Sequence, residues 1–280
     1  MAFDGKVAVV TGGGSGIGRA LAEELGRRGA VVTVADIRDT SAAEVAAGIA
    51  ASGGRAAAAH ADVSQAEEVQ RLVDEAVREH GRLDLMFNNA GIGVGGEIRD
   101  LTLEHWRAAI AVNLQGVVHG VAAAYPVMIR QGAGHIVNIA SLSGLIPSPG
   151  LGPYATTKGA VVSLTGALRA EAEAYGVRAS VVCPGFVDTA IFENAIGVKV
   201  EKEKLLKRIG LPLISAAEAA REIVQGIERN VGVMVFPRSA RVVWRMARWA
   251  PWMMAPLHRR LLQGLRESDS PPRRRDAEKD

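Results

Sequence analysis

Short apolar runs alternate with longer amphipathic stretches along most of this 280-residue chain. Such alternation is typical of βαβ units, in which parallel strands form a sheet and the intervening helices cover its two faces. The expected strands are apolar at consecutive positions, as in strands that are buried on both sides. They span residues 6–11, 30–36, 55–61, 83–88, 135–140, 177–183 and 232–236. The sequence therefore predicts an α/β domain with a doubly wound parallel sheet.

Helical periodicity and composition suggest how the chain is divided. Helices are expected through residue 28, and at 40–52, 65–80, 103–130, 154–175 and 216–229. A single domain is expected over residues 1–237, because no linker composition interrupts it. Residues 238–266 form a basic, Trp-rich helical extension, and residues 267–280 are expected to be a disordered tail.

Charge is distributed unevenly along the chain. Residues 229–266 contain eight Arg and no acidic residue, whereas residues 267–280 contain four basic and five acidic residues. Because the whole chain has a formal net charge of +3, residues 1–228 carry a net charge of −4. The basic balance comes from one late segment, so no nucleic-acid-binding face spread over the domain is expected.

The cysteine content and the first residues bear on the compartment. One cysteine, Cys183, excludes an internal disulfide and fits a reducing environment. The first residues lead directly into a predicted strand, without the basic and apolar regions of a signal peptide. We find no uninterrupted apolar stretch long enough to span a bilayer. A cytoplasmic protein is therefore expected.

A glycine-rich turn, Gly12–Gly18, joins the first predicted strand to the first helix. Glycine permits a tight turn and a close approach of the backbone to a pyrophosphate, which the helix N-terminus stabilises. Asp36 ends the second predicted strand, where a carboxylate can accept hydrogen bonds from the hydroxyls of an adenosine ribose. These features predict a Rossmann-type dinucleotide site.

The acid also bears on which dinucleotide is bound. A carboxylate at Asp36 would repel a 2′-phosphate, so NAD is favoured over NADP. The neighbouring Ile37 offers no charge for a phosphate, but Arg38 does, and NADP stays open as the alternative.

Tyr154 and Lys158 stand four residues apart in a predicted helix, so their side chains share one face. A free phenol has a pKa of about 10 and is a poor acid or base at neutral pH. A fixed positive charge nearby favours the phenolate and brings that pKa towards the range of general acid–base catalysis. The alternative is a solvated surface pair, which is common and nearly neutral energetically.

Several motifs occur in a fixed order along the chain. They are Gly12-xxx-Gly16-x-Gly18, Asn88-Asn89-Ala90-Gly91, Asn113 within Val112–Leu114, Ser141, Tyr154-xxx-Lys158 and Pro184–Thr189. Taken together, over about residues 5–236, this set resembles the short-chain dehydrogenase/reductase family. The resemblance implies a Rossmann-type fold and hydride transfer between a nicotinamide and a secondary alcohol or ketone.

The resemblance also implies roles for four residues. Tyr154 would be the general base in oxidation and the general acid in reduction. Lys158 would lower the phenol pKa and bind the nicotinamide ribose. Ser141 would hydrogen-bond the substrate oxygen, and Asn113 would hold a water that links Lys158 to solvent. From the residues alone, Ser141 could instead be a strand-end cap and Asn113 a local helix hydrogen-bonding residue.

Further residues are assigned to the dinucleotide by their match to the family. Asp62 and Val63 match its adenine-binding pair, although Asp62 could also be a loop cap. Ile139 would lie beside the nicotinamide. The expected cofactor-binding set is Gly12, Ser15, Gly16, Ile17, Gly18, Asp36, Asp62, Val63, Asn89, Ala90, Gly91, Tyr154, Lys158, Pro184, Gly185, Val187 and Thr189.

Other kinds of site have less support. The six histidines are scattered without metal-ligand spacing, so no metal site is expected. Cys183 lies in an apolar strand and is expected to be a buried small hydrophobe. A dinucleotide-sensing protein without catalysis would be the non-enzyme alternative on such a fold.

The substrate is expected under a mobile lid formed by residues 190–213. Apolar residues there and after Ser141 suggest a hydrophobic pocket for an aliphatic, terpenoid or steroid-like alcohol. They are Ile191, Phe192, Ile196, Leu142, Leu145 and Ile146.

The extension at residues 238–265 combines a Trp-rich apolar stripe with flanking Arg residues. Its stripe comprises Val242, Met246, Trp249 and Met253, with Trp244 and Trp252 beside it, and Pro251 and Pro256 are expected to break the helix. Such a stripe could contact an anionic bilayer, pack on a partner subunit or close the substrate pocket. By resemblance, the protein would be a homodimer or homotetramer.

Overall fold

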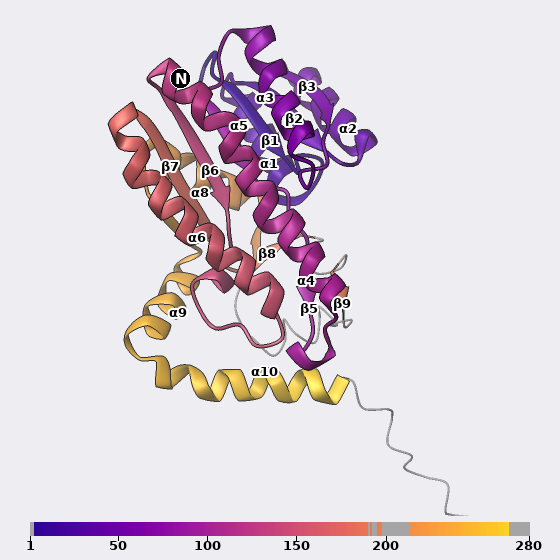
Figure 1. Cartoon of the computed structure of the whole chain (residues 1–280), viewed down its shortest axis with the longest axis vertical. Helices are drawn as coiled ribbons and strands as arrows, with labels where there is room; N and C mark the ends of the chain where they lie inside the picture. Colours follow the sequence, from indigo (N-terminus) through magenta and orange to yellow (C-terminus); the bar gives the residue numbers. More distant parts are fainter. Residues whose placement is uncertain (1–2, 190, 192–194, 198–212, 269–280) are drawn as a thin grey trace, which may run out of the picture.

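The computed structural model describes residues 3–189, 191, 195–197 and 213–268. Its main sheet has seven parallel strands in the order β11-β7-β6-β4-β1-β2-β3 (Figure 1). These strands are β1 (Val7–Thr11), β2 (Val31–Asp36), β3 (Arg55–His60), β4 (Leu85–Asn88), β6 (Gly134–Ile139), β7 (Val177–Pro184) and β11 (Val233–Phe236). The predicted doubly wound parallel sheet is confirmed.

Helices cover both faces of the sheet. One face packs against α1 (Gly16–Arg27), α2 (Asp39–Ala51) and α8 (Ala216–Glu228), and the other against α3 (Ala66–His80), α5 (Gly116–Gln131) and α6 (Gly152–Ala172). Alternate residues of β1 enter the two cores: Ala8 and Val10 enter the first, and Val7 and Val9 the second. This two-sided burial explains why the strands are apolar at consecutive positions.

The long helix expected at residues 103–130 is divided. It consists of α4 (Leu103–Ile110), a π-helical turn (Ala111–Gln115) and α5. By length and composition this stretch could cross a membrane, contrary to the expectation from sequence that no stretch would. Its apolar residues Ala123, Ala124 and Met128 are buried in the core, so the composition reflects packing against the sheet.

Several short elements connect the layers. Two pairs of two-residue strands were not predicted: β5 (Val94–Gly95) with β9 (Ile196–Gly197), and β8 (Val187–Asp188) with β10 (Ile214–Ser215). The 3₁₀ turns are η1 (Ile98–Asp100), η3 (Leu142–Gly144) and η4 (Glu173–Tyr175). A strand of two residues is too short to show the alternation that sequence analysis relies on.

The C-terminal extension is helical, as α9 (Arg238–Trp249), η5 (Pro251–Met254) and α10 (Ala255–Ser268). Pro251 follows the end of α9, as predicted. Pro256 does not break the helix, because it lies in the first turn of α10, where no partner for its missing N–H is required. The helix continues two residues into the segment expected to be a tail, and the remainder of that segment, 269–280, lies outside the described residues.

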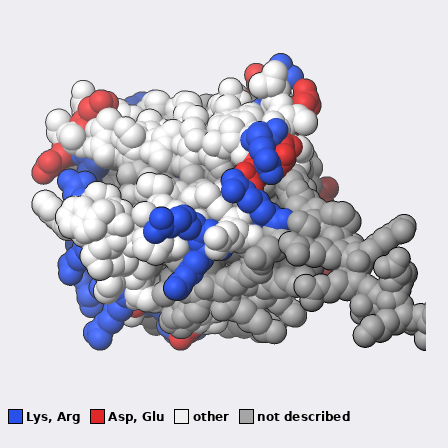
Figure 2. Space-filling model, turned by 90° about the horizontal axis from the view of Figure 1, so that it is seen from below, with Lys and Arg blue, Asp and Glu red and all other residues white. Residues whose placement is uncertain are grey.

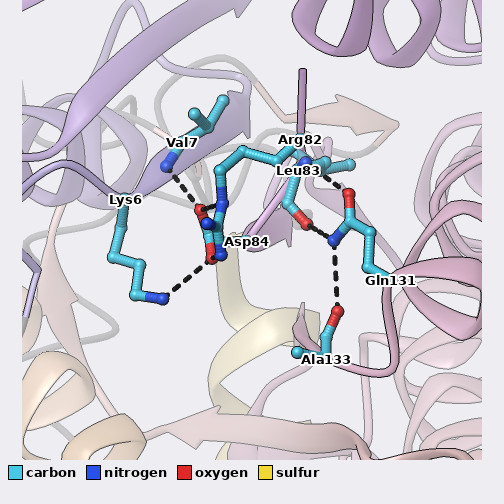
Figure 3. Close-up of polar contacts among 7 residues, drawn as sticks. All are labelled: Lys6, Val7, Arg82, Leu83, Asp84, Gln131 and Ala133. Carbon is cyan, nitrogen blue, oxygen red and sulfur yellow. Dashed lines mark hydrogen bonds and ion pairs between the residues drawn. The ribbon is translucent and has the colours of Figure 1, made fainter. Parts of the chain in front are cut away.

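Asp84 connects neighbouring strands at the end of the sheet where the strands begin (Figure 3). Its carboxylate accepts hydrogen bonds from the Val7 backbone N–H at 3.0 Å, from Lys6 Nζ at 3.0 Å and from Arg82 Nε at 2.8 Å. Burial alone would raise the pKa of this carboxyl, but the hydrogen bonds from Arg82, Val7 and Lys6 outweigh it and hold the pKa below its usual range. The ionised carboxylate thus joins the starts of β1 and β4.

Replacing Asp84 tests that role. We expect Asp84→Asn to lower the free energy of unfolding by about 1–3 kcal/mol, because Asn accepts the Val7 hydrogen bond but carries no charge for Lys6 and Arg82. Urea denaturation would measure the change. The matched control is Asp74→Asn on the exposed side of α3, expected within about 0.5 kcal/mol of the parent. Equal losses in both variants would contradict the assignment.

His135 is buried at the start of β6. Its Nε2 lies 2.8 Å from Ser180 Oγ, whose own proton is donated to the Val231 carbonyl at 2.7 Å. The histidine is therefore the donor and is neutral. Burial, with help from the charges of Arg178 and Arg169, lowers its pKa to about 3.

This shift makes the fold acid-sensitive. The unfolded chain binds a proton at His135 below its ordinary pKa of 6.5, whereas the folded chain does not until about 3. Stability is therefore fully present above pH 6.5 and is lost as the pH falls through that interval. Between pH 7 and pH 5 we expect the parent to lose about 2 kcal/mol more than His135→Gln, which keeps a donor for Ser180 but cannot titrate. Parallel pH profiles of unfolding free energy would refute this.

Candidate active site

A cavity of about 410 Å³ lies at the edge where the strands of the sheet end. It is lined mainly by residues that follow β1, β2, β3, β4, β6 and β7. From β1 the chain continues outward to β2 and β3, and it then crosses to β4 on the other side of β1. The loops that follow β1 and β4 therefore lead in opposite directions and diverge there. Ligands of open α/β sheets bind at such a point.

The glycine-rich turn forms one wall of the cavity. Gly12 and Gly16 have φ angles of 62° and 53°, which side-chain-bearing residues rarely adopt. A Cβ at Gly12 would lie 2.8 Å from the Cα of Ala90, so the turn is packed directly against the loop after β4. Helix α1 begins at Gly16 without a side-chain cap, which leaves its first N–H groups for an anion.

Thr11 and Asn89 join the turns after β1 and β4. Thr11 Oγ1 accepts hydrogen bonds from the backbone N–H groups of Asn89 (3.0 Å) and Ala90 (3.2 Å). Asn89 Nδ2 donates to the carbonyls of Thr11 (2.9 Å) and Gly12 (3.1 Å). The side chain of Asn89 therefore holds the two turns together as well as lining the cavity.

Asp36 is buried at the cavity edge. Its Oδ2 accepts a hydrogen bond from Gly14 N at 2.9 Å, and its Oδ1 accepts one from Arg38 N at 3.0 Å. The guanidinium of Arg38 extends across the acid: Nη2 donates to Ser15 Oγ at 3.0 Å, and Nε lies 3.6 Å from Asp36 Oδ1. The acid and the base that were predicted to compete for cofactor choice therefore lie in contact.

Tyr154 and Lys158 are both buried, with 6% and 2% of their surfaces exposed. Both line the cavity on α6. Lys158 Nζ donates a hydrogen bond to the Ile139 carbonyl at 2.8 Å and lies 5.8 Å from the centre of the Tyr154 ring. The alternative of a solvated surface pair is therefore wrong.

The protonation of the pair differs from expectation in one respect. Burial raises the pKa of the Tyr154 phenol, and a hydrogen bond with Ser141 opposes that rise. Burial lowers the pKa of Lys158 to about 8. The predicted lowering of the phenol pKa is not found in the chain by itself, because burial disfavours both charged forms and the ammonium is directed to the Ile139 carbonyl.

Cys183 lies beside this pair at the end of β7. It is fully buried, and burial raises its pKa to about 12. The thiol is therefore neutral and unreactive. This agrees with the expectation of a buried small hydrophobe.

Ser141 lies two residues after the end of β6 and lines the cavity. Its Oγ accepts a hydrogen bond from Ser143 N at 3.2 Å, which makes it the cap of η3, and its hydroxyl opposes the rise in the pKa of Tyr154. The reading of Ser141 as a strand-end cap is therefore confirmed, and its hydrogen bond to a substrate oxygen stays a prediction.

Asn113 lies behind the cavity wall, in the π-helical turn. Its Oδ1 accepts from Ile92 N at 2.8 Å and its Nδ2 donates to Ile92 O at 3.0 Å, so the hydrogen bonds are not local to the helix. A Cβ at Gly91 would lie 3.1 Å from Asn113 Oδ1 and 3.4 Å from Lys158 Nζ. Asn113 thus positions the loop over Lys158 and does not line the cavity.

Two other predicted residues also lie outside the lining. Asp62 caps its loop, with Oδ1 accepting from Ser64 N at 2.9 Å. Gly18 serves packing, since a Cβ there would collide with the Gly12 carbonyl. The remaining predicted residues do line the cavity: Gly12, Ser15, Gly16, Ile17, Asp36, Val63, Asn89, Ala90, Gly91, Ser141, Tyr154, Lys158, Pro184, Gly185, Val187 and Thr189.

The lining also includes residues that the sequence analysis did not assign to the site. They are Ile37, Ala61, Ile92, Gly93 and Ala140. Each lies within a few residues of the end of a strand of the main sheet, and that position was the available signal.

The predicted hydrophobic pocket is only partly formed by the expected residues. Ile191 lines the cavity, whereas Leu142, Leu145 and Ile146 pack into the core with Val181 and Val235. Their assignment to the pocket is wrong, because η3 turns them towards the sheet. Phe192 and most of the expected lid lie outside the described residues.

Comparison of the whole sequence with known proteins finds the same family that the motifs of the chain resemble. Residues 6–197 match the family model described as short chain dehydrogenase. The chain is 41% identical over 259 residues to the probable oxidoreductase EphD of Mycobacterium tuberculosis, covering 89% of this chain and 44% of EphD. It therefore spans less than half of that relative.

Two further proteins match over most of both chains. Cyclohexanol dehydrogenase of Acinetobacter sp. is 39% identical over 214 residues, which cover 75% of this chain and 84% of the relative. The crystal structure of a short chain dehydrogenase/reductase from Burkholderia phymatum in complex with NAD superposes with a TM-score of 0.82 at 32% identity, covering 91% of this chain and 96% of that one.

Proposed function

The chain belongs to the short-chain dehydrogenase family, and from that premise we propose that it transfers a hydride between NAD(H) and a hydrophobic secondary alcohol or ketone. The observation that carries the proposal is the buried group of Ser141, Tyr154 and Lys158 at one end of the cavity. Similarity to a cyclohexanol dehydrogenase supports a secondary alcohol as substrate.

The residues present fit a dinucleotide. The glycines of the first turn have no Cβ where one would enter the wall, and Asp36 presents a carboxylate at the far end from Tyr154. A bound nicotinamide would supply the hydride acceptor or donor. Gly12, Gly16 and the start of α1 would hold the pyrophosphate, and Asp36 the adenosine ribose.

The chain supplies proton transfer and orientation. Tyr154 accepts the proton of the alcohol in oxidation and returns one to the carbonyl oxygen in reduction. Ser141 Oγ hydrogen-bonds to the same oxygen and stabilises the charge that develops on it. Lys158 keeps a positive charge next to the phenol, and the Ile139 carbonyl fixes the position of its ammonium.

The burial of Tyr154 determines how the rate of proton transfer should depend on pH. Tyr154 and Lys158 are both buried, and a cation near a buried phenol stabilises the phenolate more than it would in solvent. Because the raised pKa of Tyr154 disfavours phenolate, alcohol oxidation should become faster as the pH rises, and ketone reduction should become slower.

The choice between NAD and NADP depends on the contact between Asp36 and Arg38. The carboxylate accepts two backbone hydrogen bonds, so it is held in place, whereas the side chain of Arg38 is more than half exposed. A 2′-phosphate would meet the fixed negative charge before it could recruit the arginine. NAD is therefore the proposed cofactor, with NADP as the alternative if Arg38 turns outward.

Replacing the phenol tests the catalytic role. With NAD(H) and a panel of secondary alcohols and ketones that includes cyclohexanol, Tyr154→Phe should lower kcat by about 10²–10⁴-fold, because only the proton-transferring hydroxyl is lost. The matched control is Tyr175→Phe, which makes the same change on an exposed residue.

Dinucleotide binding, followed by fluorescence, should change little in Tyr154→Phe and shows that the variant is folded. Full activity of Tyr154→Phe on a substrate of the parent enzyme would refute the acid–base role. Activity of neither protein on any substrate, with dinucleotide still bound, would favour the sensing alternative.

A second experiment tests cofactor choice. We expect the parent to have a kcat/KM for NAD at least ~10-fold above that for NADP. Asp36→Asn should reduce this preference for NAD, because Asn keeps the acceptor for Gly14 N without the charge. Arg38→Gln is the companion variant. If it selectively removes activity with NADP while the parent prefers NADP, the NAD assignment is wrong.

A further inference from the structure

The C-terminal extension presents a surface that the reaction does not require. Helix α9 is seated firmly on the domain: Ala240 is buried, Val243 and Trp244 pack against the core with Val235, and a Cβ at Gly185 would lie 2.9 Å from that of Ala240. Of the three tryptophans in this segment, Trp244 is thus used for packing.

The end of α9 and the turn that follows it expose the other two. Trp249 and Trp252 are 76% and 72% exposed and Met253 is 55% exposed, whereas the next residue, Met254, is buried. This part of the chain is therefore anchored through Met254 while it presents three large apolar side chains within five residues. Tryptophan combines an apolar ring with a polar N–H, which suits the boundary between water and lipid.

Basic residues surround these apolar side chains. Residues 238–266 contain seven Arg and no Lys, Asp or Glu. Arg241 contacts the Val235 carbonyl and Glu222, and Arg266 pairs with Glu97 at 2.8 Å. Five exposed arginines have no carboxylate partner within the part of the chain that the structure describes: Arg238, Arg245, Arg248, Arg259 and Arg260.

The arginines and tryptophans share one side of the extension. Arg245 and Trp249 are four residues apart on α9 and so lie on the same helix face. The Arg248 guanidinium lies 5.8 Å from the centre of the Trp249 ring. Figure 2, which views the molecule from the side of α10, shows basic side chains spread over the described part of this face.

We propose that α9, the turn Ala250–Met254 and the start of α10 form a docking surface for an anionic lipid bilayer. The exposed tryptophans and Met253 insert at the level of the headgroups, and the unpartnered arginines bind anionic lipid. Residues 1–228 carry a net charge of −4, so they oppose binding to anionic lipid on balance, and the contrast with the basic extension orients the protein.

The charge of the surface disfavours a second copy as its occupant. Two copies that met through this face would bring their arginines together, because the acidic residues that border it, Glu97 and Glu222, already pair with Arg266 and Arg241. Like charges across an interface oppose association. A nucleic acid would use the arginines but would leave Met253 and Val242 exposed in water.

The far end of the extension is attached to the domain close to the cavity wall. In Figure 1, α10 runs along the bottom of the molecule, and its C-terminal end lies towards β5. The Arg266–Glu97 ion pair fastens its far end next to η1, beside the loop that ends at Gly93 in the cavity wall. A docked protein would therefore bring the substrate end of its cavity near the bilayer, where hydrophobic alcohols and ketones concentrate.

Vesicle sedimentation with the full-length chain tests the proposal, without added dinucleotide so that the result does not depend on the reaction. Vesicles of phosphatidylcholine with phosphatidylglycerol should pellet the protein, and vesicles of phosphatidylcholine alone should pellet much less. Arg245→Gln/Arg248→Gln should weaken partitioning by about 25-fold, at about fivefold per arginine. Trp249→Ala/Trp252→Ala should weaken it at least ~10-fold.

The matched control is Arg71→Gln/Arg78→Gln, which removes two exposed arginines from α3 and should leave partitioning unchanged. All four substitutions of the tested pairs are at exposed positions, and thermal melting should show that each variant folds. The tryptophan emission of the parent should shift to shorter wavelength with anionic vesicles only.

Three outcomes would overturn the proposal. One is absence of vesicle binding by the parent, and another is equal binding by the Arg245→Gln/Arg248→Gln variant. A third is binding to an oligonucleotide, or a smaller oligomer for Trp249→Ala/Trp252→Ala in sedimentation velocity, without any preference for anionic lipid. The last result would assign the face to nucleic acid or to a second copy.

Discussion

The clamp between Thr11 and Asn89 is the contact on which the site depends. Parallel pairing of β1 with β4 brings the two following turns together, and the Thr11 hydroxyl and the Asn89 amide join them with four hydrogen bonds to the backbone or from it. The glycines then allow these turns to approach within contact distance. Without this clamp the turn before α1 and the loop that carries Gly91 would have no common position, and the cavity between them would have no defined wall.

Burial of Lys158 is the second constraint. A buried ammonium is costly unless it is hydrogen-bonded, and the Ile139 carbonyl at the end of β6 meets part of that need. The same carbonyl fixes the ammonium beside Tyr154. Asn113 supports this arrangement from outside the cavity by holding both backbone groups of Ile92. The π-helical turn puts Asn113 at that point, and π-turns interrupt helices at functional sites more often than elsewhere.

Much of the fold and of the site could be predicted because the signals are local. Strand and helix periodicity located the seven strands, and the motif residues Ser141, Tyr154 and Lys158 do line one cavity. The predictions that were wrong have one cause: the packing of the folded chain decides where a side chain lies. Leu142, Leu145 and Ile146 are as apolar as pocket residues, but η3 turns them into the core. Asp62 and Gly18 match the family pattern, yet one caps a loop and the other allows helix and turn to touch.

The sequence by itself determined the order of strands and helices, the place of the glycine-rich turn and the residues of the proposed acid–base pair, because each depends on residues close together in the chain. Only the tertiary structure decided which charges are solvated. It buried Tyr154 and Lys158. Lys158 was predicted to lower the pKa of the phenol, but burial raises the pKa of Tyr154 and lowers that of Lys158. It also separated three similar tryptophans, burying part of Trp244 against the core and exposing Trp249 and Trp252, since exposure depends on neighbours that are distant in sequence.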